Sequence, residues 1–406
     1  MVINTLLALG IRKHIKDRRM YNFDEVIDRR NTNSYKWNVA ENELAMWVAD
    51  MDFKTAPCVL EALQHRVDHG VFGYADLPDE WYAAYQYWWK TYHNFEIQKE
   101  WMVFTTGVIP AISTTVRKFT TPAEKVVVQT PVYNMFFNSI VNNGRVVLEN
   151  PLKFDGENYE IDFSDLEEKL SDPLTTLMIL CNPHNPVGKI WNKEELAKVG
   201  ELCKKHHVMV LSDEIHCDLC APGKEYVPFA SVSDTCKEIS ITTIAPTKAF
   251  NIAGLQTAAV VAPNKGIKDR IWRALNTDEV AEPNAFAVDV AIAAFTKGRQ
   301  WNEELRAYIQ ENKDRVEAYL KDHLPKVRMI SKDATYLLWL DVSAYTDNSK
   351  ELAAFLRKET GLFVSHGMIY RGDGNHFFRL NVACPKATLE DGLARLKKGL
   401  ETWDNH

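Results

Sequence analysis

Residues 238–256 have the sequence E-I-S-I-T-T-I-A-P-T-K-A-F-N-I-A-G-L-Q, and this stretch decides where the fold can place a reactive group. Its first seven residues are mostly apolar or β-branched, which predicts a buried strand. A tight segment containing Gly254 follows, so Lys248 is expected at the carboxyl end of that strand. In open α/β sheets ligands bind at this edge, and burial lowers the pKa of a lysine, which then reacts more readily with a carbonyl group. The alternative is a surface lysine that merely follows a strand.

The sequence around this stretch alternates between strand-like and helix-like segments. Short apolar runs predict buried strands at residues 101–104, 125–129, 176–181, 208–212, 238–243 and 257–261. Helical spacing predicts helices at residues 57–69, 78–93 and, after the capping-box-like Asn192-Lys193-Glu194-Glu195, up to about residue 206. This alternation predicts an α/β fold with a mostly parallel sheet covered by helices on both faces.

The pattern changes after Asp278, which predicts a second, smaller α+β domain. Long helices are expected at residues 283–297 and 301–323, and shorter strands and helices at residues 334–341, 352–360, 363–366, 377–382 and 389–403. We therefore expect residues 61–299 to form a large domain, and residues 20–60 and 300–406 to form a small one. No repeat or Pro/Ser-rich linker separates them, so they should pack closely with a ligand-binding cleft between them.

Composition argues against several classes of protein. Hydrophobic residues make up 46% of the 406 residues and charged residues 25%, which is ordinary for a globular protein. The formal net charge of -7 argues against nucleic acid or an anionic membrane as a partner. Seven cysteines, an odd number in a long chain, argue against a disulfide framework and predict a cytoplasmic location.

The first nineteen residues are expected to stand apart from the fold. Residues 1–10 are mildly apolar but far shorter than the ~20 residues that span a bilayer, and positive charges follow them instead of preceding them. A second methionine, Met20, opens the segment in which the recognisable sequence begins. We expect residues 1–19 to be a disordered or non-native extension: either Met20 is the true start, or the first nineteen residues are poorly ordered.

Polar and small residues follow several of the predicted strands in a pattern that fits one cofactor, pyridoxal 5′-phosphate. Chemistry through this cofactor needs a lysine to form an imine, and an acid that keeps the pyridine nitrogen protonated. Lys248 and Asp213 meet these needs at two strand ends. The other candidates are Asn185 for a ring oxygen, Tyr133 for ring stacking, Gly107, Val108, Ile109 and Thr247 for a phosphate, and Arg379 for a substrate carboxylate.

Each of these residues also has a structural alternative. An Asp after a strand is usually a helix cap, N-P-H-N-P is a turn, and an Arg in a strand is usually paired or solvated. Their appearance in this order, each at a strand end, favours the shared site. The C-D-L-C sequence at residues 217–220 lies beside His216, but no second CxxC or His pair completes a tetrahedral site, so no metal is predicted. No G-x-G-x-x-G follows a strand, which argues against a dehydrogenase.

Longer motifs carry a resemblance to a known family. They are W-V-A-D-M-D-F from Trp47, F-G-Y from Phe72, G-V-I-P-A from Gly107, N-P-H-N-P-V-G from Asn182, S-D-E-I-H from Ser212, K-A-F-N-I-A-G-L from Lys248 and F-R-L-N-V-A-C-P from Phe378. The chain resembles the fold-type I pyridoxal-phosphate enzymes, or aspartate aminotransferase superfamily, and within it the cystalysin-like MalY/PatB-type cystathionine β-lyases. The resemblance extends from about Met20 to the end and implies a large domain with a sheet of the seven-stranded type.

The resemblance implies a role for each candidate. Lys248 forms the imine and then moves protons, Asp213 pairs with the pyridinium, and Asn185 contacts the ring O3′. Arg379 binds the α-carboxylate of the substrate, and His216 is expected near the ring hydroxyl. The ring is stacked by Tyr133, and the phosphate is bound by Gly107, Val108, Ile109 and Thr247.

The resemblance also implies a homodimer, because Tyr74 is expected to reach the phosphate region of the neighbouring subunit's site. Asp50 and Met51 are candidates for substrate contact, as are Tyr370 and Arg371, but the sequence does not rank them. Two positions depart from the family: Thr247 stands where serine is more frequent, and Asn134 follows Tyr133 where related enzymes can carry a second aromatic residue.

The implied reaction is α,β-elimination from a small sulfur-containing amino acid. Lys248 removes the Cα proton, a thiolate leaves from Cβ, and pyruvate and ammonia follow; cystathionine would yield homocysteine and cysteine would yield sulfide. An aminotransferase shares the early steps, and the partition depends on competing barriers that the sequence does not report. A third alternative is a regulatory protein, because MalY-type lyases suggest that such a fold can bind a transcription factor, although no sequence patch marks a partner surface.

Overall fold

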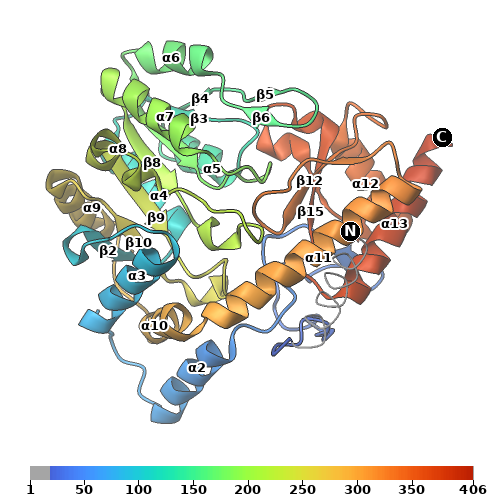
Figure 1. Ribbon diagram of the computed structural model, residues 1–406, viewed down its shortest axis with the longest axis horizontal. Coiled ribbons are helices and arrows are strands. Elements are labelled where there is room, and N and C mark those ends of the chain that lie inside the picture. The colour runs from blue at the N-terminus through green and yellow to red at the C-terminus, as the bar shows by residue number, and fades with distance from the viewer. Residues whose placement is uncertain (1–18, 406) are drawn as a thin grey trace, which may run out of the picture.

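The computed structural model describes residues 19–405, and its largest element is a seven-stranded sheet (Figure 1). In spatial order the strands are β2 (Met102–Thr105), β10 (Ala258–Val261), β9 (Ser240–Ile244), β8 (Met209–Asp213), β7 (Thr175–Cys181), β3 (Lys125–Val128) and β4 (Val146–Glu149). Strand β10 is antiparallel to both neighbours and the other pairs are parallel, which confirms the mostly parallel sheet. The proposed N-terminal extension lies outside the described residues, except for Arg19.

Helices cover both faces of this sheet because successive strand residues point to opposite sides. In β3, Val126 and Val128 join one apolar cluster and Val127 joins another. The first cluster takes residues from α4 (Val108–Phe119), α5 (Met135–Val141) and α9 (Lys265–Thr277). The second takes residues from α6 (Phe163–Ser171), α7 (Lys193–Lys205) and α8 (Asp234–Ile239), and α7 begins with the expected capping box at Asn192.

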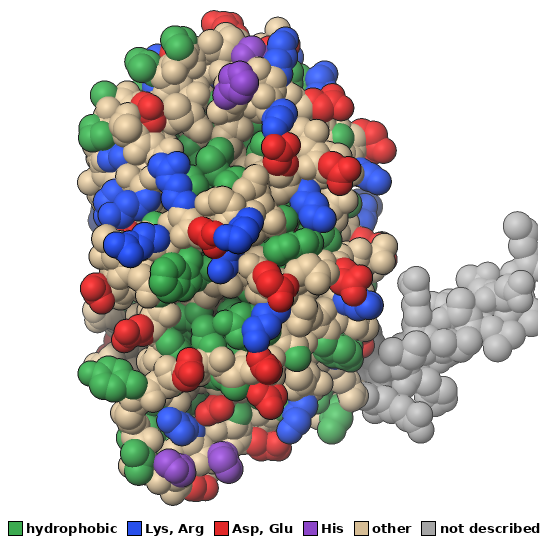
Figure 2. All heavy atoms as spheres, turned by 90° about the vertical axis from the view of Figure 1, so that its left-hand side faces the viewer, with side chains coloured by type: hydrophobic (Ala, Val, Ile, Leu, Met, Phe, Trp, Pro, Cys, Tyr) green, Lys and Arg blue, Asp and Glu red, His purple; other side chains and the backbone are tan. Residues whose placement is uncertain are grey.

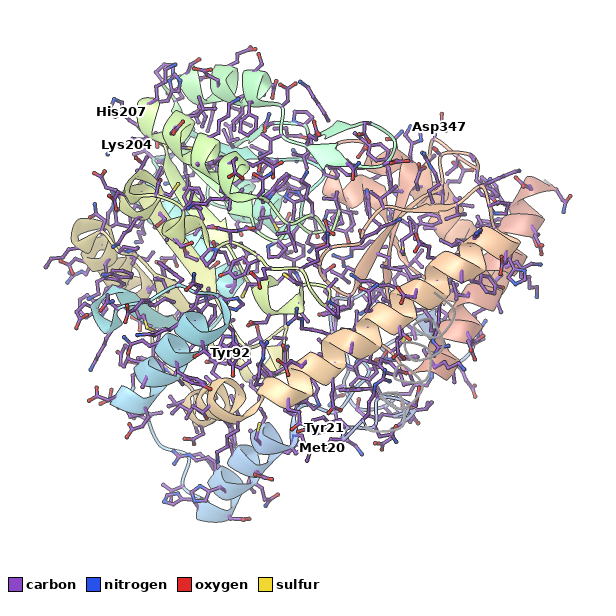
Figure 3. The ribbon with its side chains drawn as sticks, in the orientation of Figure 1. Met20, Tyr21, Tyr92, Lys204, His207 and Asp347 are labelled. Atoms are coloured by element: carbon purple, nitrogen blue, oxygen red, sulfur yellow. The ribbon has the colours of Figure 1, made fainter. Side chains whose placement is uncertain are left out.

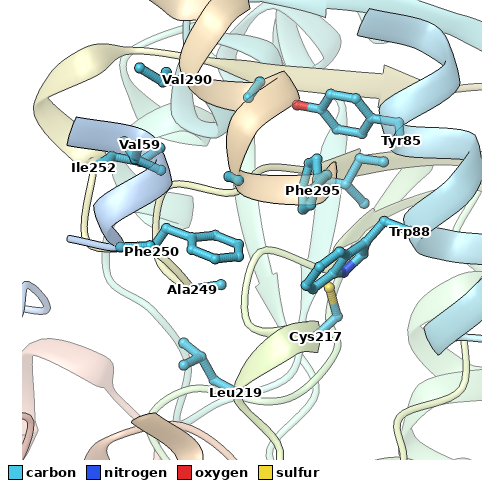
Figure 4. Close-up of a cluster of buried hydrophobic side chains, with 14 of the residues drawn as sticks. Val59, Tyr85, Trp88, Cys217, Leu219, Ala249, Phe250, Ile252, Val290 and Phe295 are labelled. Atoms are coloured by element: carbon cyan, nitrogen blue, oxygen red, sulfur yellow. The ribbon is translucent and has the colours of Figure 1, made fainter. Parts of the chain in front are cut away.

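A third cluster is rich in aromatic rings and lies against the segment that carries Lys248. It joins α3 (Asp79–Tyr92) to α2 (Pro57–His69) and α10 (Ala287–Lys297). The ring centres of Tyr85 and Trp88 on α3 lie 4.7 and 5.2 Å from that of Phe295. Figure 4 shows these side chains facing one another. Ala249 and Phe250 belong to the same cluster and are fully buried. The aromatic face expected for residues 78–93 therefore anchors the residues that follow Lys248.

The C-terminal part of the chain has its own sheet and apolar core. The antiparallel strands are ordered β11 (Arg328–Met329), β12 (Leu337–Asp341), β15 (Phe377–Asn381) and β14 (Ser365–His366), and α11 (Arg299–His323), α12 (Ser349–Thr360) and α13 (Lys386–Asp404) share their core. Leu44 and Met46 join this core, and β1 (Leu44–Ala45) pairs with β13 (Leu362–Phe363). The N- and C-terminal segments thus pack together, as expected for a small domain, while the boundaries at residues 60 and 300 stay a prediction.

Two peripheral features complete the fold. A short hairpin, β5 (Lys153–Phe154) with β6 (Tyr159–Glu160), lies outside both larger sheets. The backbone N–H groups of Met20 and Tyr21 donate to Glu304 of α11 at 3.0 and 3.1 Å, so the chain packs on this long helix from its first described residues (Figure 3).

Within residues 19–405, no helix has the length and apolar character needed to cross a membrane.

Several expected boundaries differ from those in the structure, such as the helix expected to begin at residue 352, which begins at Ser349, and three of the differences have a clear local reason. The hydroxyl of Ser233 accepts the N–H of Cys236 and caps α8, so β9 begins at Ser240 and not at residue 238. The side chain of Asn284 accepts the N–H groups of Phe286 and Ala287, and this turn delays α10 to Ala287. Residues 363–366 divide between β13 and β14, which pair with different strands.

Replacing two glycines tests how closely the N-terminal segment at Asn42 packs against the end of α12 in the small domain. Gly361 and Gly70 both end a helix at a φ of 72°. A Cβ at Gly361 would lie 2.3 Å from the carbonyl oxygen of Asn42, whereas at Gly70 the nearest atom would be 3.9 Å away. We expect Gly70→Ala to lower the free energy of unfolding by about 1 kcal/mol, the cost of the left-handed conformation. Gly361→Ala should cost about 2–3 kcal/mol, because the Asn42 backbone must also shift. Denaturant unfolding measures both, and equal losses would contradict this explanation.

Candidate active site

Three neighbouring strands end at the same level of the large sheet. Cys181 at the end of β7 is paired with Asp213 at the end of β8, and Asp213 is paired with Thr243 in β9. Lys248 follows β9, which ends at Ile244, and lies in the turn at residues 247–251. Side chains far apart in the sequence therefore meet at one carboxyl edge, where α/β sheets bind their ligands.

A cavity of about 270 Å³ lies at this edge. It is bordered by nine residues that the sequence predicted for the site: Gly107, Val108, Ile109, Tyr133, Asn185, Asp213, His216, Thr247 and Lys248. Seven further residues border it: Ala49, Thr106, Pro110, Cys181, Ile215, Ala253 and Gln256. The fold thus gathers most of the candidates around one space, and their individual roles stay predictions.

The amine of Lys248 lies at the cavity wall. Its Nζ donates to the carbonyl oxygen of Ala49 at 2.6 Å. Burial lowers the pKa of Lys248 to about 8; the positive charge of Arg379 acts in the same direction, while Asp50 and Asp213 oppose it. A substantial fraction of this lysine is therefore a neutral, nucleophilic amine near pH 8.

The carboxylate of Asp213 is buried and has only neutral hydrogen-bond donors. The N–H of Ile215 lies 3.2 Å and the hydroxyl of Thr243 lies 3.4 Å from its Oδ1. Burial raises the pKa of Asp213 to about 7, and these donors with the charge of Lys248 offset part of that rise. A positively charged group in the cavity would restore the ionised form, so Asp213 can hold a cationic ring nitrogen.

The start of α4 can bind an anion. Gly107 is the residue before the helix, and no side chain caps the N–H groups of the first turn. These N–H groups and the positive end of the helix dipole favour a phosphate, and both Gly107 and the hydroxyl-bearing Thr247 border the cavity.

Arg379 does not border the cavity but donates to Asn185, which does, and it retains capacity for another partner. It is 5% exposed, and its two terminal nitrogens donate to the Asn185 side chain at 3.3 Å and to the Trp47 carbonyl at 3.0 Å. Its buried Nε has no hydrogen-bond partner within the described chain. Its guanidinium carbon lies 4.9 Å from the centre of the Tyr370 ring. A planar guanidinium held in this way can receive a carboxylate.

His216 and Tyr133 complete the cavity wall with groups that stay neutral at pH 7. Burial lowers the pKa of His216 to about 3, and the charges of Lys248 and Arg379 lower it further. The Nδ1 atom of His216 is buried with no partner among residues 19–405. Burial raises the pKa of Tyr133, so its phenol is uncharged.

Five other candidates do not border this cavity. Tyr74 is fully exposed. The carboxylate of Asp50 pairs with Arg29 at 2.9 Å, and Met51 is buried in the aromatic cluster. Tyr370 lies beneath Arg379, and Arg371 pairs with Glu149 at 2.8 Å. Contact between any of these residues and a substrate therefore stays a prediction.

Cys217, Cys220 and His216 are not arranged as ligands of one metal ion. Cys220 donates to the Cys217 carbonyl at 3.3 Å, while His216 borders the active-site cavity. Of the described residues, the one group with metal-ligand geometry is His93, Cys217 and Asp218. In that group Asp218 Oδ1 is already hydrogen-bonded to His93 at 2.7 Å and to Trp88 at 2.7 Å.

The fold and the cavity define an enzyme class in which a partly buried lysine, a buried aspartate and an anion-binding helix start surround one ligand. Comparison with known proteins gives the family. A sequence model described as Aminotransferase class I and II matches residues 41–396, and the chain belongs to this family.

Individual relatives are similar over nearly their whole length. Cystathionine beta-lyase PatB of Bacillus subtilis is 45% identical over 93% of this chain and 100% of PatB. Protein MalY of Escherichia coli is 33% identical over 93% of this chain and 98% of MalY. The crystal structure of cystalysin from Treponema denticola, which contains pyridoxal 5′-phosphate, has a TM-score of 0.91 at 32% identity and covers 95% of this chain and 100% of its own. The resemblance to PatB- and MalY-type proteins is confirmed.

The sequence did not indicate the role of Ala49. The W-V-A-D-M-D-F motif was recognised, but its contribution to the cavity is a backbone carbonyl, which any residue type could supply. Cys181 and Gln256 were also missed as cavity residues. The position of Cys181 at the end of a predicted strand was the available signal, because each neighbouring strand end supplied a candidate.

Replacement of Asp213 by Asn tests whether burial opposes the charge of this carboxylate. Its pKa of about 7 lies above the ordinary 3.8, so the folded protein binds more protons than the unfolded chain between about pH 4 and 7. The wild type without ligand should therefore lose stability as pH rises through this window. Asp213→Asn lacks this titration. Its unfolding free energy minus that of the wild type should therefore be about 2–3 kcal/mol larger at pH 8 than at pH 5.

Urea unfolding of ligand-free protein at the two pH values measures this difference. Burial raises the pKa of Glu214 to about 7 as well, but Glu214 is present in both proteins and cancels in the comparison. A mutant-minus-wild-type difference that is the same at pH 5 and pH 8 would contradict the assignment.

Proposed function

We propose that this protein is a pyridoxal-phosphate-dependent carbon–sulfur β-lyase that converts L-cystathionine or a related cysteine S-conjugate to a thiol, pyruvate and ammonia. The observation that carries the proposal is the single cavity shared by Lys248, Asp213 and the uncapped start of α4. The 45% identity to a cystathionine beta-lyase across the whole of that protein supports the reaction class.

The residues present fit this cofactor. The N–H groups of Gly107, Val108 and Ile109 with the Thr247 hydroxyl would hold its phosphate, and Asp213 would hold its ring nitrogen. Lys248 would bind its aldehyde, Asn185 and His216 would lie near its ring oxygen, and Tyr133 would stack on its ring. The buried, unpartnered Nδ1 of His216 and Nε of Arg379 support the fit, because such atoms need a partner.

In the proposed reaction each side chain has a defined task. Arg379 binds the α-carboxylate and orients the Cα–H bond, and the neutral amine of Lys248 takes the Cα proton. When bound, the cofactor supplies an electron sink for the pair left at Cα. The Cβ–S bond then breaks with its electron pair on sulfur, which leaves as the thiol after it takes up a proton. Water releases ammonia from the remaining three-carbon unit and leaves pyruvate.

An aminotransferase is the second candidate, and it is supported by the family that the chain belongs to. The same residues would remove the Cα proton in that reaction, so the cavity does not distinguish the two. The names of PatB and of the lyase from Corynebacterium glutamicum, 28% identical over 92% of this chain, favour the lyase. Binding to a transcription factor is the third and weakest candidate, since no described surface points to it.

A homodimer with shared sites would explain the position of Tyr74. Its side chain is 100% exposed in the single chain, and Leu60, Val67, Val71 and Phe72 nearby are also exposed. A cluster of exposed apolar groups is typical of a protein interface. Figure 2 shows one face of the molecule, on which hydrophobic side chains lie among charged ones.

The setting we propose is the cytoplasm, with a place in methionine biosynthesis if cystathionine is the substrate. All seven cysteines are unpaired, which supports a reducing compartment. Cleavage of cystathionine at Cβ releases homocysteine, the thiol that a methylation would convert to methionine. A small sulfur amino acid is therefore the expected partner, and nucleic acid and membranes are not.

The lyase and aminotransferase reactions separate in one assay. The purified protein with pyridoxal phosphate should release pyruvate and thiol from L-cystathionine when no keto acid is added. Lys248→Ala should lose at least about 10³-fold in turnover, because it removes the group that moves the proton. Amino transfer to a keto acid without pyruvate release would contradict the lyase, and a Lys248→Ala protein with wild-type turnover would contradict the site.

Mixed dimers test the placement of Tyr74. Tyr74→Ala and Lys248→Ala should each be nearly inactive alone, but one site of a mixed dimer would combine an intact Lys248 with an intact Tyr74 from the other subunit. Random mixing of equal amounts should therefore restore about a quarter of wild-type activity. If subunit exchange is verified and no activity returns, Tyr74 does not act across the interface.

A further inference from the structure

Residues 47–53, called here the 47–53 strap, run past the cavity, which Ala49 borders, and several of their backbone carbonyls are hydrogen-bonded. The Trp47 carbonyl accepts from Arg379 at 3.0 Å and from Ser365 at 3.2 Å. At the other end, the Asn251 side chain accepts the Met51 N–H at 2.9 Å and donates to the Met51 and Phe53 carbonyls at 3.0 and 2.8 Å. The strap is thus tied to β15 at one end and to the segment after Lys248 at the other.

The Ala49 carbonyl, in the middle of the strap, meets two donors. Lys248 Nζ lies 2.6 Å and the Tyr336 hydroxyl lies 2.9 Å from this oxygen. Both donors are anchored elsewhere, Lys248 after β9 and Tyr336 just before β12. The direction of the Ala49 carbonyl therefore determines whether the lysine amine has an acceptor.

Asn381 fixes that direction. Its side-chain nitrogen donates to the Val48 carbonyl and to the Asp50 carbonyl, both at 2.6 Å. Its side-chain oxygen accepts the Ala383 N–H at 2.8 Å, and the residue is 1% exposed. Because the carbonyls on both sides of Ala49 converge on one nitrogen, the carbonyl between them is left to face Lys248.

We propose that Asn381 is a positioning residue for Lys248, and that the Ala49 carbonyl it holds is the acceptor for the lysine amine whenever that amine is not bound to the cofactor. This inference rests on the proposed function, which requires Lys248 to be released before it moves a proton. The acceptor keeps the released amine at the cavity wall and in one orientation. The carbonyl also favours the protonated amine, so it counteracts part of the effect of burial.

The charged and titratable groups that face Lys248 come from several elements. Asp213 at the end of β8 and Asp50 in the strap favour the protonated lysine, and Arg379 on β15 opposes it. His216 is neutral because its pKa is lowered to about 3. None of these groups is replaced in the variants chosen below, and Tyr336→Phe alters the bonding of the Ala49 carbonyl without removing the bond between Asn381 and Asp50.

Asn381→Ala removes the two bonds to the strap, and Asn312→Ala is its matched control. Asn312 is also 1% exposed, and its side chain donates to two carbonyls, those of Val382 and Cys384, both at 2.9 Å, without touching the strap. Asn381→Ala also loses the bond from the Ala383 N–H to its side-chain oxygen, so it removes three side-chain bonds and Asn312→Ala removes two. Both variants should lose stability in denaturant unfolding, and Asn381→Ala should lose more, by the contribution of about one hydrogen bond.

The readout is the acetylation of Lys248 by acetic anhydride in the cofactor-free full chain, followed from pH 6 to 10 by peptide mass spectrometry. The midpoint should lie near pH 8 in the wild type. In Asn381→Ala it should fall by about 0.5–1 pH unit, because the protonated amine loses its acceptor. Asn312→Ala should keep the wild-type midpoint. Tyr336→Phe, which leaves the carbonyl to the lysine alone, should shift the midpoint upward.

An unchanged or raised midpoint in Asn381→Ala, or an equal shift in Asn312→Ala, overturns the proposal. If Asn381→Ala does not fold, the Tyr336→Phe variant tests the proposal instead. An unchanged or lowered acetylation midpoint of Lys248 in Tyr336→Phe also overturns the proposal. This labelling needs neither cofactor nor sulfur substrate. A protein that shows the expected shifts but cleaves no carbon–sulfur bond would contradict the proposed function and leave the placement of the lysine intact.

Discussion

The whole site depends on the alignment of β7, β8 and β9, which end level with one another in the interior of the protein. This alignment places Asp213 and Lys248 where water is largely excluded, and burial changes both in the direction that disfavours charge. The pKa of the acid rises to about 7 and that of the amine falls to about 8. A cationic ring nitrogen would stabilise the ionised form of the acid, and an aldehyde would react with the neutral amine, so one ligand can engage both groups.

The fold supports this edge from two directions. The aromatic cluster between α3 and α10 buries Ala249 and Phe250, which fixes the segment that carries Lys248. The 47–53 strap is the second support: its Met51 and Phe53 join the same cluster, and its Val48 and Asp50 carbonyls are held by Asn381 of the small sheet. The chain reaches the cavity from its N-terminal segment, its central sheet and its C-terminal sheet, so the site exists only when all three are assembled.

The sequence predicted the parts of the site that depend on local patterns. A buried apolar run followed by a polar residue identified Asp213, Asn185 and Lys248, because strand ends have both a compositional signal and a known place in α/β sheets. The Ala49 carbonyl could not be predicted in this way, because its direction is set by a side chain more than three hundred residues away in the sequence. The position of Tyr74 depends on a second chain, and no pattern within one sequence supplies that geometry.

Asp213 and Glu214 show why burial alone does not identify the functional acid. Both are buried, and burial raises the pKa of each to about 7. The carboxylate of Glu214 is enclosed by donors from Ser212, Tyr226 and Phe229 at 2.8–3.0 Å, so it is satisfied by the protein and holds residues 226–229 against β8. Asp213 borders the cavity with weaker neutral donors at 3.2 and 3.4 Å. Adjacent residues at a strand end point to opposite sides, and only the one facing the cavity retains capacity for a ligand.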